Sequence, residues 1–141
     1  MVKVKQMVAR ELYYVAPSDT VAQVARQMVL LRVGAIVVLE NRRLLGVFSE
    51  RDLMTRVVLE RLDPEATPVS EVMTTEVVTV DETEGIELAM DSMRVNQCRH
   101  LPVLNGEEVV GFLSMRDLMH FELARKTEEL HRIRAYVHGA A

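Results

Sequence analysis

The chain repeats itself at a fixed spacing of 65 residues. Residues 46–54 have the sequence GVFSERDLM and residues 111–119 have GFLSMRDLM, so six of nine positions are identical. The register continues without a gap from Val4, which matches Val69, to Leu53, which matches Leu118. Self-similarity at a fixed period indicates one structural unit built twice. We therefore expect one unit over residues 1–62 and a second over residues 68–122. Residues 123–141 form a C-terminal extension.

Each unit shows the order strand, helix, strand, strand, helix. In the first, strands are expected at 12–15, 35–39 and 44–48, with a helix capped by Ser18 or Asp19 and another from Ser49 to about residue 60. In the second, strands are expected at 76–80, 101–104 and 109–113, with helices at 83–95 and from Ser114 to about His138. Asn105-Gly106 predicts the second hairpin turn, because both residues tolerate positive φ. The pattern predicts a mixed α/β (α+β) fold of two β-α-β-β-α units. A unit of about 60 residues buries too little surface to be stable alone, so we expect the two units to share one core.

Composition narrows the classes of partner and compartment. The net charge of −4 argues against nucleic acid as the main partner, because backbone binding needs a basic face. Arg42-Arg43 and the arginines near the C-terminus remain a weaker nucleic-acid alternative. No apolar run approaches the roughly 20 residues that cross a bilayer, and the first residues lack the apolar stretch of a signal peptide. Cys98 is the only cysteine, which excludes an internal disulfide and fits a reducing compartment. We expect a cytoplasmic protein without a membrane partner.

The motif Gly-x-x-Ser-x-x-Asp closes each unit at the start of its last helix, and two interpretations compete. Serine followed three residues later by an acid is close to a capping box, which contributes about 1 kcal/mol and needs no ligand. Alternatively, the free amides of the helix N-terminus bind a phosphate, and the carboxylate accepts hydrogen bonds from the two hydroxyls of a ribose. The glycine then permits close approach of a backbone, and Arg51 or Arg116 neutralises the phosphate.

Two tandem units that end in this motif resemble a pair of CBS domains, also called a Bateman module. Val72-Met73, the RHLPV sequence at residues 99–103, and the ending at residues 128–139 strengthen the resemblance, the last of them to stand-alone CBS-pair proteins of bacteria and plant organelles. The resemblance implies that each aspartate holds a ribose, each serine approaches a phosphate, and backbone groups recognise an adenine in an apolar cleft. The implied first site comprises Val15, Ala16, Gly34, Ala35, Ile36, Val37, Gly46, Ser49, Arg51 and Asp52. The implied second site comprises Thr79, Val80, Arg99, His100, Leu101, Pro102, Val103, Gly111, Ser114, Arg116 and Asp117.

We expect the second site to be the better nucleotide site, because Arg99 and His100 would add cationic contacts to phosphate, whereas the first site has Gly34-Ala35 at those positions. The corresponding function is a regulatory module that binds an adenosine ligand and modulates a partner protein in trans. AMP is the first choice, with ADP, ATP, NAD and S-adenosylmethionine as competitors. The alternative is a dimerisation or scaffold module whose Ser-x-x-Asp motifs only cap helices.

The remaining motifs predict a partner subunit, but neither a catalytic site nor a metal site. We find no catalytic constellation and expect neither an enzyme nor a catalytic cofactor. No metal site is expected either, since His100, His120, His131 and His138 lack partners at ligand spacing. In the extension, Leu123, Leu130, Ile133 and Val137 form an apolar seam at heptad-like spacing. So small a body cannot cover this seam, which predicts a homodimer with residues 123–141 in its contact.

Overall fold

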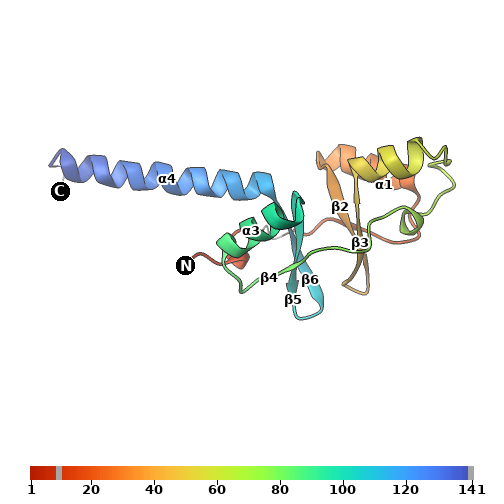
Figure 1. Ribbon diagram of the computed structural model, residues 1–141, viewed down its shortest axis with the longest axis horizontal. Helices are drawn as coiled ribbons and strands as arrows, with labels where there is room; N and C mark the ends of the chain where they lie inside the picture. Colours follow the sequence, from red (N-terminus) through yellow and green to blue (C-terminus); the bar gives the residue numbers. More distant parts are fainter. Residues whose placement is uncertain (9–10, 140–141) are drawn as a thin grey trace.

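The computed structural model describes residues 1–8 and 11–139. Its six strands form one sheet in the order β1, β2, β3, β6, β5, β4 (Figure 1). The strands are β1 (Tyr14–Val15), β2 (Ala35–Glu40), β3 (Arg43–Ser49), β4 (Val80–Asp81), β5 (His100–Asn105) and β6 (Glu108–Ser114). Each half has the same pairing, with one parallel pair and one antiparallel hairpin. The halves meet at a single paired position, Arg43 opposite Glu108. The two-unit α/β (α+β) prediction is therefore confirmed.

The helices follow the predicted order but begin at different residues. They are α1 (Val21–Leu31), α2 (Glu50–Asp52), α3 (Ile86–Asn96) and α4 (Met115–Val137). The prediction that Ser18 or Asp19 caps α1 was wrong. Thr20 is the cap, because its hydroxyl accepts from the Gln23 amide at 3.2 Å, whereas Asp19 accepts from the Ala16 amide at 2.9 Å and closes the preceding turn. Helix α3 begins at Ile86 rather than residue 83, after Gly85 as its cap.

The helix that follows Ser49 is not a continuous α-helix. After the single turn of α2 the chain widens into η2 (Leu53–Val58), a π-helical turn in which the Leu59 amide donates to the Met54 carbonyl at 3.0 Å. Such widened turns often occur at functional sites. Strands β1 and β4 are shorter than predicted, because residues 12–13 and 76–79 do not pair in the sheet. Asn105 ends β5 instead of turning, and Gly106 takes the positive φ of 63°.

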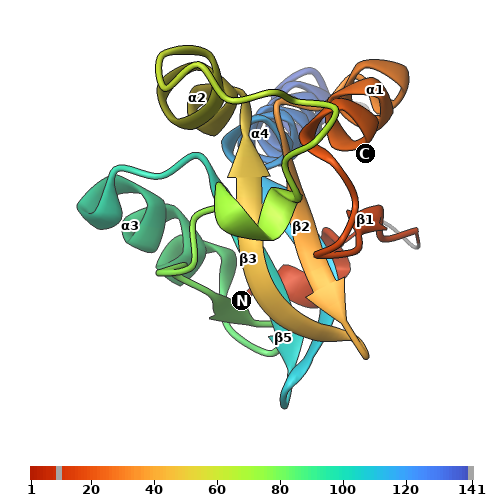
Figure 2. The ribbon, with the colours of Figure 1, turned by 90° about the vertical axis from the view of Figure 1, so that its right-hand side faces the viewer.

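The expectation that the two units share one core holds in part. The buried side chains form two large clusters, around Phe48 and around Leu101, and each contains residues of both units: Val69, Val72 and Met73 belong to the first cluster and Val4 to the second. Val37, Leu39 and Val109 form a third, smaller cluster that contains residues of both units. The two large clusters are separate because the hairpins pair at only one position of the sheet, so each hairpin is covered mainly by its own helices. Figure 2 shows this for the first unit, where α1 and α2 lie beside the upper ends of β2 and β3.

The segments that lead into the two units are exchanged in space. The first of them contains η1 (Val4–Gln6) and packs on the second unit, where the Val4 amide donates to the Glu84 carbonyl at 2.8 Å. The other contains η3 (Val69–Glu71) and packs on the first unit, where Thr74 and Val47 exchange two amide hydrogen bonds of 2.9 Å. The exchange ties the units together more firmly than the sheet does.

Helix α4 leaves the body of the protein after its second turn. Leu118 is fully buried in the second unit, but every residue from Leu123 to Val137 is exposed. Figure 1 shows this part of α4 projecting away from the sheet. Among the described residues, no helix combines the length and the apolar character needed to span a bilayer.

Candidate functional site: a cleft between the two units

A cleft of about 1150 Å³ opens between the units, on one side of the hairpin seam. The first unit contributes the start of β2, the end of β3, α2 and the first turn of η2. The second contributes the residues before and at the start of β5, and the segment that leads to β4 forms a third wall. The lining residues are Gly34, Ala35, Val47, Ser49, Glu50, Arg51, Asp52, Met54, Thr55, Arg56, Thr74, Glu76, Val77, Val78, Asn96, Gln97, Cys98, Arg99 and His100.

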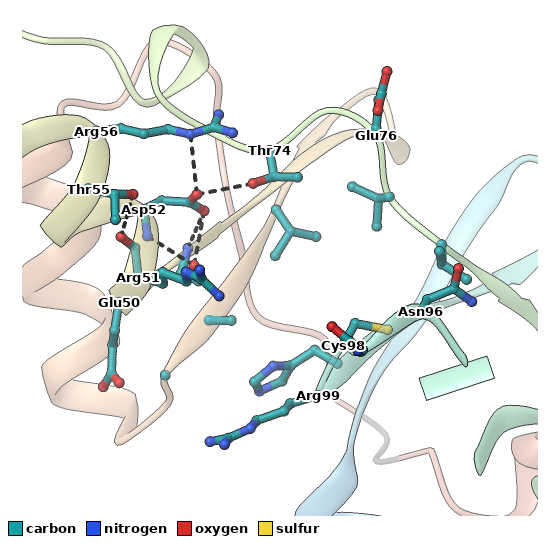
Figure 3. Close-up of a pocket in the computed structure, with 18 of the residues that line it drawn as sticks. Glu50, Arg51, Asp52, Thr55, Arg56, Thr74, Glu76, Asn96, Cys98 and Arg99 are labelled. Carbon is teal, nitrogen blue, oxygen red and sulfur yellow. Dashed lines mark hydrogen bonds and ion pairs between the residues drawn. The ribbon is translucent and has the colours of Figure 1, made fainter. Parts of the chain in front are cut away.

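Asp52 is the buried acid of this cleft, with 7% of its surface exposed. Its Oδ2 accepts from the amide and the hydroxyl of Ser49, both at 3.0 Å, while the Ser49 hydroxyl accepts from the Asp52 amide at 3.2 Å. Its Oδ1 accepts from the Thr74 hydroxyl at 3.1 Å and lies 3.6 Å from Nε of Arg56 (Figure 3). The capping box is therefore complete, and Thr74, from the segment that leads into the second unit, donates a further hydrogen bond to its aspartate.

Cationic side chains converge on the cleft from both units. Arg51 follows Glu50 at the start of α2, and Arg99 precedes β5. Figure 3 shows the Arg99 side chain extending from the second unit toward the side of the cleft where Glu50 of the first unit lies. Arg56 is engaged by Asp52 and by the Met73 carbonyl, to which it donates at 2.8 Å. Within the described residues neither Arg51 nor Arg99 forms an ion pair, so both guanidinium groups can meet an anion.

His100 lies half-buried at the floor, where its ring stacks on Phe112 with 5.1 Å between centroids. Burial lowers the pKa of His100 below its ordinary value, and Arg99 lowers it further, although Asp117 and Glu50 oppose the shift. The lowered pKa favours the neutral imidazole at pH 7, whereas the sequence suggested a cationic contact from His100. Burial also raises the pKa of the neighbouring Cys98 thiol, which stays protonated.

The structure divides the residues of the two sites expected from the sequence. Five first-site residues line the cleft, together with Arg99 and His100, which we had expected at the second site: Gly34, Ala35, Ser49, Arg51 and Asp52. The others do not line it: Val15, Ala16, Ile36, Val37, Gly46, Thr79, Val80, Leu101, Pro102, Val103, Gly111, Ser114, Arg116 and Asp117. Asp117 is exposed and forms the same capping box, since the Ser114 amide donates to its Oδ2 at 2.9 Å.

The two repeated glycines serve the packing of the exchanged segments. A Cβ on Gly46 would lie 2.7 Å from Sδ of Met73 and 2.7 Å from the Thr74 carbonyl oxygen. A Cβ on Gly111 would collide with the side chain of Val8. The close approach that these glycines allow is therefore occupied by the protein's own chain.

Sequence reasoning did not name the other residues that line the cleft as site residues: Val47, Glu50, Met54, Thr55, Arg56, Thr74, Glu76, Val77, Val78 and residues 96–98. A signal for two of them exists in the repeat register, which pairs Thr74 with Ala9 and Arg56 with Phe121. Polar residues that are present in one copy only mark where the copies differ in chemistry. Among the described residues, no group of three or more His, Cys, Asp or Glu side chains gathers as metal ligands would.

Comparison with known proteins agrees with this architecture. The family model described as "CBS domain" matches twice, at residues 4–59 and 69–124. The CBS domain-containing protein YhcV of Bacillus subtilis is 35% identical over 118 residues, which cover 84% of each chain. The mitochondrial CBS domain-containing protein CBSX3 of Arabidopsis thaliana is 32% identical over 126 residues, 86% of this chain and 61% of that relative's length. The structure of the CBS domain protein PAE2072 from Pyrobaculum aerophilum complexed with AMP is similar with a TM-score of 0.77 and 30% identity, over 88% of this chain and 99% of that one. The chain therefore belongs to the CBS-domain family and carries two copies of the domain.

Proposed function

We propose that this protein is a regulatory module that binds AMP in the cleft between its two CBS domains and modulates a partner protein in trans. The observation that carries the proposal is the convergence of a buried Ser-x-x-Asp motif with Arg51 and Arg99, one from each domain, in a single cleft. CBS-domain pairs typically bind adenosine ligands, and the similar protein PAE2072 was solved in complex with AMP. This proposal locates the site at Asp52, whereas the sequence favoured Asp117.

Asp52 can accept ribose hydroxyls at the cost of an existing contact. A carboxylate offers about four lone-pair positions. Ser49 occupies two on Oδ2, and Thr74 and Arg56 approach the two on Oδ1. The Arg56 contact is the longest of the four, at 3.6 Å, so a ribose hydroxyl displaces it most easily. Ligand binding would thus disturb η2, which contains Arg56, and the segment that leads into the second domain.

The charge of the cleft favours a monophosphate. Asp52 is balanced by Arg56, which leaves Arg51 and Arg99 for the ligand and Glu50 near them. Two guanidinium groups match a phosphate dianion, whereas the additional charges of a triphosphate would lie near Glu50 without a cation. We expect affinity to fall from AMP to ADP to ATP.

Regulation follows if the bound ligand favours one arrangement of the two domains. The domains meet at one paired sheet position, through their exchanged leading segments and in the small cluster of Val37, Leu39 and Val109, and a ligand in the cleft adds a further connection on one side. A ligand that joins Arg51 to Arg99 would stabilise one orientation over others, which is the requirement for a population shift. The proposal includes a homodimer, which the exposed apolar residues of the helices support. It also includes a non-enzymatic role, since we find no catalytic constellation among the described residues, and a cytoplasmic location, which fits the single cysteine.

The test is calorimetric titration with AMP, ADP and ATP of the wild type, Asp52→Asn and the matched variant Asp117→Asn. We expect micromolar to millimolar AMP affinity, about −8 to −4 kcal/mol, that is lost in Asp52→Asn and kept in Asp117→Asn. Loss in Asp117→Asn alone would move the site to the second motif.

The scaffold function remains the second candidate, because both motifs form complete capping boxes without a ligand. A wild-type protein that binds none of the three nucleotides, NAD or S-adenosylmethionine and still dimerises would establish it. A nucleic-acid role has less support, because Arg42 and Arg43 lie near Glu108 and Glu107 of the second domain, at 3.9 and 2.8 Å.

A further inference from the structure

Arg56 connects three parts of the molecule through one guanidinium group. It belongs to η2, and its Nε lies 3.6 Å from Oδ1 of Asp52 in the cleft (Figure 3). A terminal nitrogen of the same group donates to the Met73 carbonyl at 2.8 Å, in the segment that leads into the second domain. A change in the contact between Arg56 and Asp52 therefore acts on η2 and on this segment together.

The widened turn of η2 depends on contacts outside the helix. Two amide hydrogen bonds span five residues, from Leu59 to Met54 and from Leu62 to Val57, both at 3.0 Å. Such π-helical bonds are rare in proteins, so tertiary contacts have to maintain them. The Val57 side chain is buried in the core of the first domain and holds one side of the turn. Arg56 holds the other side, at the cleft.

A ribose in the cleft needs the carboxylate oxygen that Arg56 approaches. Oδ2 of Asp52 already accepts from the amide and the hydroxyl of Ser49, and Oδ1 accepts from the Thr74 hydroxyl. A carboxylate has about four lone-pair positions, so the last one lies on Oδ1, on the side of Arg56. Without a ligand, Arg56 thus occupies the position that a ribose hydroxyl requires.

We propose that the contact between Arg56 and Asp52 is autoinhibitory: Arg56 competes with the ribose of AMP, and its displacement loosens η2. This inference rests on the proposed function and deepens it, because one residue both limits the affinity for AMP and responds to its binding. The Arg56 side chain is 49% exposed, so the displaced guanidinium group remains hydrated. The release of Arg56 is therefore compatible with binding of a metabolite at ordinary concentrations.

The loosening of η2 carries the effect of the ligand to an apolar surface. Val58 and Leu59, at the end of the widened turn, have 62% and 73% of their surface exposed, and neither lines the cleft. Helix α1 of the same domain also exposes apolar side chains, Val29 and Leu30, at 77% each. AMP would thus alter residues that it does not contact, which is what regulation at a distance requires.

The second domain has no counterpart of this contact. The repeat register pairs Arg56 with Phe121, which packs on the core of the second domain. Helix α4 also continues from Ser114 without a widened turn. The autoinhibitory contact therefore belongs to the first motif alone, where the cleft is.

Calorimetric titration of the wild type, Arg56→Met and Arg26→Met with AMP tests the competition. Methionine keeps an unbranched apolar stem but removes the guanidinium group. Arg26 pairs with Glu65 at 2.6 Å outside the cleft and provides the matched control. We expect Arg56→Met to bind AMP about fivefold more tightly and Arg26→Met to bind it as the wild type does. Loss of a cation alone would weaken binding of a phosphate, so weaker or unchanged binding by Arg56→Met would overturn the proposal.

A second ligand, 2′,3′-dideoxy-AMP, isolates the contribution of the ribose. It carries the adenine and the phosphate but neither hydroxyl group, so it does not compete with Arg56 for Asp52. Its affinity should not rise in Arg56→Met. An equal rise for both nucleotides would mean that Arg56 obstructs another part of the ligand, and would overturn the competition.

Hydrogen exchange of the full chain measures the hold of Arg56 on η2. The amides of Leu59 and Leu62 report on it, because they form the two widened bonds. We expect their exchange to accelerate about tenfold in Arg56→Met without nucleotide and in the wild type with AMP, and AMP to have no further effect in Arg56→Met. Retained protection of β2 in Arg56→Met shows that the variant folds.

The outcomes separate this inference from the proposed ligand function. Unchanged exchange at Leu59 and Leu62 in Arg56→Met would overturn the hold on η2, whether or not AMP binds. If the wild type binds no AMP but Arg56→Met still accelerates the exchange, the ligand function fails and the hold of Arg56 on η2 stands.

Discussion

The two Ser-x-x-Asp motifs are the same in sequence and in local structure, yet they lie in different surroundings. Both serines cap a helix, and both aspartates accept from the serine amide, at 3.0 Å for Asp52 and 2.9 Å for Asp117. Asp52 is buried beneath Thr74 and Arg56 and lines a cleft, whereas Asp117 is exposed. A repeated motif therefore guarantees the cap, and the site depends on what the rest of the chain places around it.

The surroundings differ because single residues differ between the copies. The repeat register pairs Arg56 with Phe121, which packs on the core of the second domain instead of approaching an aspartate. It also pairs Gly34-Ala35 with Arg99-His100. All four residues line the cleft, which thus combines the small residues of one copy with the large residues of the other. The asymmetry creates one cleft that draws on both domains.

The largest expected difference between the motifs is in stability. Asp52→Ala removes a cap and leaves Thr74 and Arg56 without their acceptor, which should lower the free energy of unfolding by about 3 kcal/mol. Asp117→Ala removes only an exposed cap, worth about 1 kcal/mol. Urea unfolding of the two variants measures both values. Equal losses would mean that the contacts of Thr74 and Arg56 contribute nothing to folding.

The order of the elements could be predicted from sequence because it depends on local patterns that occur twice. The apolar run at residues 35–39 and the hairpin that follows it were found where they were expected. The π-helical turn of η2 could not be predicted, since its sequence fits an ordinary α-helix. The division of the core into clusters that combine residues of both units could not be predicted either, because the exchange of leading segments depends on contacts between residues far apart, such as Val4 and Glu84.

The site was predicted less well than the fold. The motif grouped Ser49, Arg51 and Asp52, and all three line the cleft because they lie within one helical turn. The motif gave no information on whether the Arg99 side chain would point toward the motif of its own unit or toward that of the other unit. The sequence placed Arg99 beside Asp117. Its carbonyl does accept from the Met115 amide at 2.8 Å, but its side chain extends toward the side of the cleft where Glu50 of the other domain lies (Figure 3). Partners that come from another domain cannot be read from a motif within one.

The second prediction compares the arginines that follow the two serines. Arg51→Ala should weaken AMP binding about tenfold, because it removes one of two cations available to the phosphate. Arg116→Ala is the matched control at the repeated position and should leave affinity unchanged. Calorimetric titration of both variants tests the difference. Equal effects would show that both motifs bind the nucleotide.

The third prediction concerns the hydrogen bond that distinguishes Asp52 from Asp117 most directly. Thr74→Val removes the donor to Oδ1 of Asp52 and should lower the free energy of unfolding by about 1 kcal/mol. AMP affinity should rise about threefold, because the position freed on Oδ1 lets a ribose hydroxyl bind without displacing Arg56. Thr55→Val is the control, since Thr55 lines the same cleft but donates to the Arg51 carbonyl instead. A fall in AMP affinity for Thr74→Val would indicate that Thr74 itself contacts the ligand.

The smallest expected effect comes from His100, whose charge interacts with Glu50 in the first motif and with Asp117 in the second. Because burial holds its pKa below 6.5 in the folded protein, the unfolded chain takes up the proton first as the pH falls. The contribution of His100 to stability is therefore complete above about pH 7 and is lost as the pH falls through 6.5 toward the lower folded value. We expect the melting temperature to fall between pH 7.5 and pH 5.5 by about 2 °C more in the wild type than in His100→Gln. A bound phosphate near His100 would raise its pKa, so AMP should reduce this difference in the wild type. An AMP effect of equal size in His100→Gln would place the phosphate away from the histidine.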